Sequence, residues 1–206
     1  MEWVKQLDEI QSSALKEMAN IGISHVATAI GEISKEKIDI SLPDLDYFSK
    51  NQLVDTESRN EEIVVAYLTV EAISNFTETL IILSRKDAIG LMNKFVNVED
   101  YKIVDTELLS AEEQQSIFSE LSTVIAATYF SAIDSMFNLK TRCGVPKVSF
   151  ADDKSIDFLN DTLKHNEGIS IKVSFRSDPS SLSGSLMLIP DPNSLDVLFN
   201  TIGIGR

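Results

Sequence analysis

Three polar side chains near the start of the chain have types and spacing that could act on another molecule. Ser13, Glu17 and Asn20 follow one another at intervals of four and three residues. Because an α-helix turns by about 100° per residue, this spacing puts all three on one face of a helix. Their flanks on the helix, among them Ala27 and Thr28, are small. Such a face could lie close against another protein and push a carboxylate and a carboxamide into its surface.

The same pattern also has an ordinary structural explanation. A glutamate and an asparagine three residues apart on a helix are usually solvated surface residues. Asparagine inside a helix costs about 0.5 kcal/mol relative to alanine, which is a weak indication that Asn20 serves another purpose.

Other kinds of reactive site find little support in the sequence. Cys143 is the only cysteine, which excludes an internal disulfide and a site built from several thiolates. His25 and His165 are the only histidines, and neither has a plausible metal-ligand neighbour. We therefore expect no bound metal, and neither a metalloenzyme nor a Ser/His/Asp or Cys/His hydrolase. We interpret His25 as a surface or partly buried residue and Cys143 as an ordinary small residue.

The site pattern recurs 103 residues later in the chain. The segment from Ser13 to Asn20, followed by Pro43, aligns with a segment in which serine, glutamate and proline keep their places and threonine replaces asparagine. The corresponding residues are Ser116, Glu120, Thr123 and Pro146. This self-similarity predicts an internal repeat with halves at about residues 1–103 and 104–206.

Each half has the pattern of a long helix, a proline-started extended piece, two strands and a short helix. The predicted helices are residues 10–34, 87–95, 112–137 and 193–202, and the predicted strands are 63–70, 79–83, 168–175 and 184–189. We expect a single domain over residues 1–206 of mixed α/β composition (α+β type). In it, two long helices with a pseudo-two-fold relation pack on an antiparallel sheet. Residues 45–60 and 151–167 are polar and are expected to be irregular surface segments.

The apolar residues of the two long helices predict which faces are buried. The first helix buries Leu15, Met18, Gly22, Val26, Ala29 and Ile33, and the second buries Phe118, Leu121, Ile125, Tyr129, Ala132 and Met136. Gly22 is expected to let the helix approach the sheet closely. Pro43 and Pro146 are expected to begin edge strands, where the missing N–H costs nothing.

Composition and charge limit the partners and the compartment. The 206 residues are 43% hydrophobic and 24% charged, which is the range of globular proteins. The formal charge of −14 disfavours binding to nucleic acid or to an anionic membrane surface. The longest apolar run, residues 63–70, is too short to cross a bilayer, and residues 1–6 lack the features of a secretory signal. We expect a cytoplasmic protein.

The residues assembled above resemble the CheC/CheX/FliY family of response-regulator phosphatases. The family pattern is Asp or Ser, three residues, Glu, two residues, Asn, and about 22 residues before Pro. Ser13, Glu17, Asn20 and Pro43 fit it in full, with 22 residues between Asn20 and Pro43. Residues 184–190 also resemble the carboxyl-terminal strand of CheC. The paired halves and the length extend the resemblance over the whole chain, with CheC the nearest member.

The resemblance implies a substrate and a role for each site residue. The substrate would be the phospho-aspartate of a CheY-type response regulator. Asn20 would orient the attacking water, and Glu17 would contact the active-site lysine of the regulator. The regulator would bring its own Mg²⁺, so this chain would bind no cofactor. CheD, a receptor-modifying deamidase, is a further partner that the resemblance implies.

The second half departs from the family pattern at Thr123. A threonine hydroxyl is shorter than a carboxamide and lacks its paired donor and acceptor. We therefore expect one working site, in the amino-terminal half, while Glu120 still permits docking. The run from Ile23 to His25 also differs from the small residues common in the family.

Two other functions stay open at this point. The chain could be a binding module that docks the regulator or CheD without hydrolysis, which the threonine would suit. It could also be a flagellar-switch component of the FliY kind, although those proteins carry a further carboxyl-terminal module and this sequence ends at Arg206.

Overall fold

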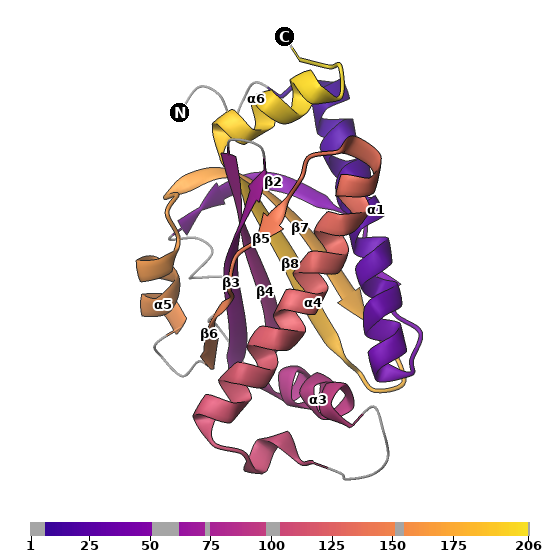
Figure 1. Ribbon diagram of the computed structural model, residues 1–206, viewed down its shortest axis with the longest axis vertical. Helices are drawn as coiled ribbons and strands as arrows, with labels where there is room; N and C mark the ends of the chain where they lie inside the picture. The colour runs from indigo at the N-terminus through magenta and orange to yellow at the C-terminus, as the bar shows by residue number, and fades with distance from the viewer. Residues whose placement is uncertain (1–6, 51–61, 73–74, 98–103, 151–154, 206) are drawn as a thin grey trace.

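Two long helices lie side by side over one face of an antiparallel sheet (Figure 1). This computed structural model describes residues 7–50, 62–72, 75–97, 104–150 and 155–205. Helix α1 covers Glu9–Ser34 and helix α4 covers Ala111–Phe137, so the predicted helices 10–34 and 112–137 are each confirmed to within one residue.

The two long helices begin and end with matched local signals. Asp8 caps α1 together with Gln11, and Ser110 caps α4 together with Glu113, so both helices start with a reciprocal capping box. At the other end, Lys35 and Asn138 adopt left-handed conformations, with φ of 58° and 52°. The chain therefore leaves the two helices in the same way.

The remaining elements include the predicted short helices and strands in the predicted order. After α1 come β1 (Asp39–Ile40), β2 (Asp44–Ser49), β3 (Ile63–Ala72), β4 (Asn75–Ser84) and α3 (Arg85–Val96). A 3₁₀ turn, η2 (Thr106–Leu108), leads to α4. After α4 come β5 (Arg142–Cys143), β6 (Lys147–Phe150), α5 (Ser155–Thr162), β7 (Glu167–Arg176), β8 (Ser183–Pro190) and α6 (Pro192–Thr201).

The sheet joins the two halves of the chain at three places. Its order is β1-β7-β8-β4-β3-β5, with β2 also on β7 and β6 also on β3. The four predicted strands pair as the antiparallel hairpins β3–β4 and β7–β8. The central pair β4–β8 joins the halves, and the short strands of each half pair with the long strand of the other. The predicted fold class is confirmed, while the internal repeat stays a prediction from the sequence.

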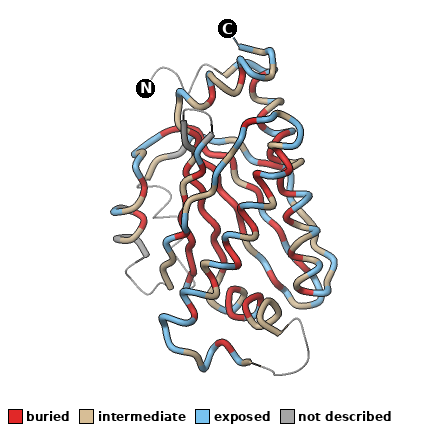
Figure 2. The backbone as a smooth tube through the Cα atoms, in the orientation of Figure 1, coloured by how far each residue is buried: buried red, intermediate tan, exposed pale blue. Residues whose placement is uncertain are grey.

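The central strands of the sheet are buried along most of their length (Figure 2), because both faces of the sheet are covered. On β3, Val64, Ala66 and Leu68 face the core beneath the long helices. Val65 and Tyr67 face the opposite side, where Leu159 of α5 covers them. Because the central strands are buried on both faces, they are almost continuously apolar rather than alternating.

Three expectations about local structure are wrong. Residues 45–60 were expected to be irregular, but residues 45–49 belong to β2; residues 51–60 lie outside the described part. Within 151–167, residues 155–162 form α5, which the sheet's second apolar face stabilises. Met136 was placed on the buried face of α4, but 56% of it is exposed. It lies in the last turn of α4, where the helix surface faces solvent.

Helix α4 is long and apolar enough to resemble a membrane span. Half of its most apolar window is buried inside the protein. Phe118, Leu121 and Ile125 enter the core beneath it. The apolar composition of α4 is therefore that of a core helix.

Candidate functional site

Helix α1 presents the predicted site residues to solvent. Ser13, Glu17 and Ser24 are exposed and Asn20 is half-buried, while Leu15, Met18 and Val26 are buried on the other face. Among the described residues, no hydrogen bond joins the Glu17 carboxylate or the Asn20 carboxamide to a neighbour. Both groups therefore keep their donors and acceptors for a molecule that docks on this face.

The next residues on this face bond to their own helix. The Ser24 hydroxyl donates to the Asn20 carbonyl at 2.7 Å, and the Thr28 hydroxyl donates to the Ser24 carbonyl at 3.1 Å. Side chains folded back in this way stay short. The surface beyond Asn20 is consequently low enough for another helix or loop to lie close to it.

Helix α4 presents the equivalent face in the second half. Ser116, Glu120 and Thr123 are all exposed, as predicted. The Thr123 hydroxyl donates to the Ser119 carbonyl at 2.9 Å. At the position of Asn20, then, α4 carries a hydroxyl whose proton is bonded to its own backbone, and no amide donor reaches outward.

The prolines of the pattern begin edge strands, as the sequence predicts. Pro43 directly precedes β2 and Pro146 directly precedes β6, and both prolines are buried. β2 pairs with β7 and β6 with β3, at opposite margins of the sheet. A proline has no N–H to donate to a neighbouring strand. At the start of an edge strand this breaks no hydrogen bond of the sheet.

Gly22 fixes the distance between the two helices rather than between helix and sheet. A Cβ atom at Gly22 would overlap the ring of Tyr129, which projects from α4 and is buried. The expectation of a packing role is correct, but its partner is wrong. The sequence predicts that Gly22 lies on the buried face of its helix. Which element packs against that face depends on the whole fold.

The end of α1 is anchored by the half-buried carboxylate of Glu36. Glu36 accepts hydrogen bonds from Lys94 of α3, from Ser177 at 2.6 Å and from Ser180 at 2.5 Å. These bonds, led by that from the Lys94 ammonium, lower the pKa of Glu36 to about 2. The carboxylate thereby ties the turn after α1 to α3 and to the turn between β7 and β8.

Nothing in the sequence analysis indicated the buried carboxylate of Glu78. Glu78 on β4 is fully buried and accepts from the Tyr67 hydroxyl at 2.9 Å and from the Lys164 N–H at 2.7 Å. Its other oxygen lies 2.5 Å from Nδ1 of His165, whose Nε2 is 3.3 Å from Asp191. Since both carboxylate oxygens of Glu78 are bonded within the protein, we assign this cluster to holding the segment before β7 against the sheet.

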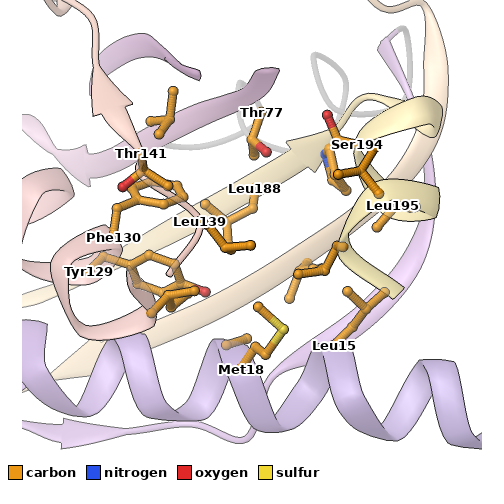
Figure 3. Close-up of a pocket in the computed structure, with 17 residues that line it drawn as sticks. Leu15, Met18, Thr77, Tyr129, Phe130, Leu139, Thr141, Leu188, Ser194 and Leu195 are labelled. Atoms are coloured by element: carbon orange, nitrogen blue, oxygen red, sulfur yellow. The ribbon is translucent and has the colours of Figure 1, made fainter. Parts of the chain in front are cut away.

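An apolar cavity of about 100 Å³ lies beneath α1 (Figure 3). Leu15 and Met18 of α1 form one wall, Tyr129 of α4 a second, and Leu195 of α6 a third. Glu17 and Asn20 do not line it, because they lie on the other face of α1. The cavity is therefore separate from the predicted site.

The remaining candidates behave as ordinary residues. His25 is exposed. Cys143 is half-buried. Its burial, and to a smaller extent the negative charge of the nearby Asp134, raises the pKa of its thiol. Within the described ranges, no group of three His, Cys, Asp or Glu side chains could hold a metal ion.

Sequence comparisons connect the first helix and the whole chain to known proteins. The model of the CheC-like family matches residues 10–47, a segment that contains Ser13, Glu17, Asn20 and Pro43. The CheY-P phosphatase CheC of Bacillus subtilis (strain 168) is 24% identical over 203 residues, which is 96% of each chain.

Solved structures share the fold at low sequence identity. FliY of Thermotoga maritima matches with a TM-score of 0.69 and 15% identity over 98% of this chain and 100% of that one. The FliM middle domain of H. pylori matches with a TM-score of 0.63 and 8% identity, over 95% of this chain and 99% of that one. CheX of Desulfovibrio desulfuricans matches with a TM-score of 0.58 and 8% identity, over 85% of this chain and 99% of that one. The family match on α1, the relative aligned along almost the entire chain and the shared fold thus make this chain similar to the CheC, CheX and FliY chemotaxis proteins.

Proposed function

We propose that this protein hydrolyses the phospho-aspartate of a CheY-type response regulator at the exposed face of α1. Water attacks phosphorus, the bond from phosphorus to the aspartate oxygen breaks, and inorganic phosphate and a free carboxylate result. The proton that the water loses passes to the phosphate product or to solvent. An acyl phosphate is already reactive, so the main requirement is one water molecule in line with the leaving oxygen.

Asn20 orients that water in the proposed mechanism. Its carboxamide oxygen can accept a hydrogen bond from the water, and its N–H groups can donate to a phosphoryl oxygen or to the water itself. The side chain is short, stands on a 26-residue helix and has no competing hydrogen bond within the described protein. This free amide on a rigid helix is the observation that carries the proposal.

Glu17 docks the regulator one turn away. Its carboxylate pairs with the active-site lysine of the regulator, which fixes how the helix lies over the phosphorylation site. The regulator brings Mg²⁺, which stabilises charge on the transferring phosphoryl group. Ser13 and Pro43 support the geometry from the same face and from the start of β2.

Phosphate release from a phosphorylated CheY-type regulator tests the proposal. Wild type should accelerate release, and Asn20→Ala should remove the acceleration while leaving binding of the regulator intact. Thr123→Ala is the matched control at the equivalent position of α4 and should leave release unchanged. An Asn20→Ala protein that still accelerates release would disprove the role of the amide.

A binding role without hydrolysis is the second candidate. The bond from Thr123 to the Ser119 carbonyl favours it for the second half, because no group there can orient water as an amide does. On this alternative the whole chain is an adaptor for the regulator or for CheD. Wild type would then bind either partner without changing the rate of phosphate release.

A further inference from the structure

Two strongly exposed apolar side chains occupy equivalent places in the two halves. Leu42 and Val145 are each 86% exposed and stand 103 residues apart. Each directly precedes one of the buried prolines, Pro43 or Pro146. Neither belongs to the hydrophobic core nor packs against it. Scattered apolar surface residues are common, but this pair recurs at one structural position.

Leu42 lies in the segment between β1 and β2, which both contact α1, the helix of the proposed site. The chain reverses at Lys35, Ile38 lies against Gly31, and β1 and β2 both contact α1. An extended run from Ile38 to Pro43 covers about 16 Å, which matches about eleven residues of helix. We infer from that length that the chain returns toward the middle of α1, the part that carries Asn20, and Figure 1 shows β2 passing beside α1.

Val145 has the corresponding relation to α4. It lies between β5 and β6, both of which contact α4, and the rings of Phe118 and Phe150 meet at 5.9 Å between α4 and β6. The two positions hold different residues, leucine and valine. Apolar character in an exposed place, rather than residue identity, is what the halves share.

A polar stripe alone makes a weak docking surface. Stable protein complexes bury about 800 Å² on each partner, with apolar side chains at the centre of the contact. The stripe of α1 offers Ser13, Glu17 and Asn20, all polar, and the apolar side chains of the helix are turned inward. Leu42 supplies an apolar group next to this stripe, and Val145 does the same beside Glu120.

We propose that Leu42 and Val145 are the apolar contacts of two equivalent docking surfaces for the phosphorylated regulator. This inference rests on the proposed function. The first surface holds the regulator for hydrolysis at Asn20. The second holds a regulator with Ser116, Glu120 and Val145 and does not hydrolyse it, because Thr123 stands where the amide would be.

Three serine variants of the full chain separate this inference from general surface effects. Leu42→Ser should raise the KM for phosphorylated regulator about tenfold or more and leave kcat unchanged, since burial of a leucine on binding is lost. Val145→Ser should reduce the number of regulators bound per chain from two to one. Leu108→Ser is the matched control, because Leu108 is 83% exposed but lies in η2.

Calorimetric titration with a regulator held in its phosphorylated form by beryllofluoride gives the stoichiometry. If Leu42→Ser leaves the KM unchanged while wild type releases phosphate, the docking inference fails and the proposed function stands. One regulator per wild-type chain would overturn the role of Val145. If wild type releases no phosphate but Leu42→Ser weakens binding, the docking surface stands and the proposed hydrolysis fails.

Discussion

The outward faces of α1 and α4 are two versions of one surface. Both carry an exposed serine and an exposed glutamate at the same spacing, and both lie beside an edge strand that begins with a buried proline. They differ at one position of the pattern: α1 presents the free carboxamide of Asn20, whereas α4 presents the Thr123 hydroxyl bonded to its own backbone. Groups suited to binding are retained in both, and the group suited to orienting water is found in one.

This comparison separates docking from chemistry. A docking surface needs exposed partners at fixed spacing, which a helix and a strand of regular geometry provide. Catalysis needs in addition a group of defined length with both a donor and an acceptor. One substitution can remove the second requirement and leave the first untouched.

Placing the threonine of α4 at the equivalent position of α1 should have the largest effect on phosphate release. Asn20→Thr should lower kcat for phosphate release by about a hundredfold or more, the scale at which loss of a positioned polar group acts on a transition state. The new hydroxyl is expected to donate to the Lys16 carbonyl, as Thr123 donates to that of Ser119. Single-turnover release of phosphate measures the effect. A kcat within threefold of wild type would break the comparison.

Removal of the Glu17 or the Glu120 carboxylate should have a smaller effect, and this effect should be on binding of the regulator rather than on kcat. Glu17→Ala should raise the KM for phosphorylated regulator about tenfold, because a charge-assisted contact is lost at the catalytic surface. Glu120→Ala should leave the KM of the reaction unchanged and weaken only the second binding event. Steady-state kinetics beside a binding titration separates the two, and equal effects of both variants on KM would contradict the assignment.

The anchor at the end of α1 predicts a pH-dependent stability. The folded-state pKa of Glu36 is about 2, below its ordinary value of 4.5. Glu36 therefore stabilises the fold fully above about pH 4.5, and this contribution is lost as the pH falls toward 2. Glu36→Gln should lower Tm at pH 7 by about 2–4 °C. The difference from wild type should shrink between pH 4.5 and pH 2, and a constant difference would contradict the ion-pair explanation.

Placing the asparagine of α1 at the equivalent position of α4 should have the smallest effect on phosphate release. Thr123→Asn adds a second amide at a surface that already docks the regulator, so phosphate release per chain should rise by no more than about twofold. A measurable gain on a background of Asn20→Ala would be the cleaner readout. No gain there would indicate that the second surface holds the regulator in a different orientation.

Much of the fold could be predicted because it is written in local patterns. Apolar periodicity located α1 and α4 to within one residue, and β-branched runs located both hairpins. The site pattern is likewise local, since Ser13, Glu17 and Asn20 share a face by helix geometry alone. Helix α5 was missed because its apolar partners, such as Val65, are distant in sequence.

By itself, the sequence determined which residues form the helices α1, α3, α4 and α6 and the long strands of the two hairpins, and which side chains share a helix face, because these follow from spacings of two and 3.6 residues. Only the tertiary structure decided how those faces meet. It placed Tyr129 on Gly22, buried the carboxylate of Glu78, joined β1 and β2 to the strand of the opposite half, and left Leu42 and Val145 in solvent. Each of these depends on contacts between residues far apart along the chain, and the free energy of such contacts is fixed only when the whole sheet and both helices are assembled.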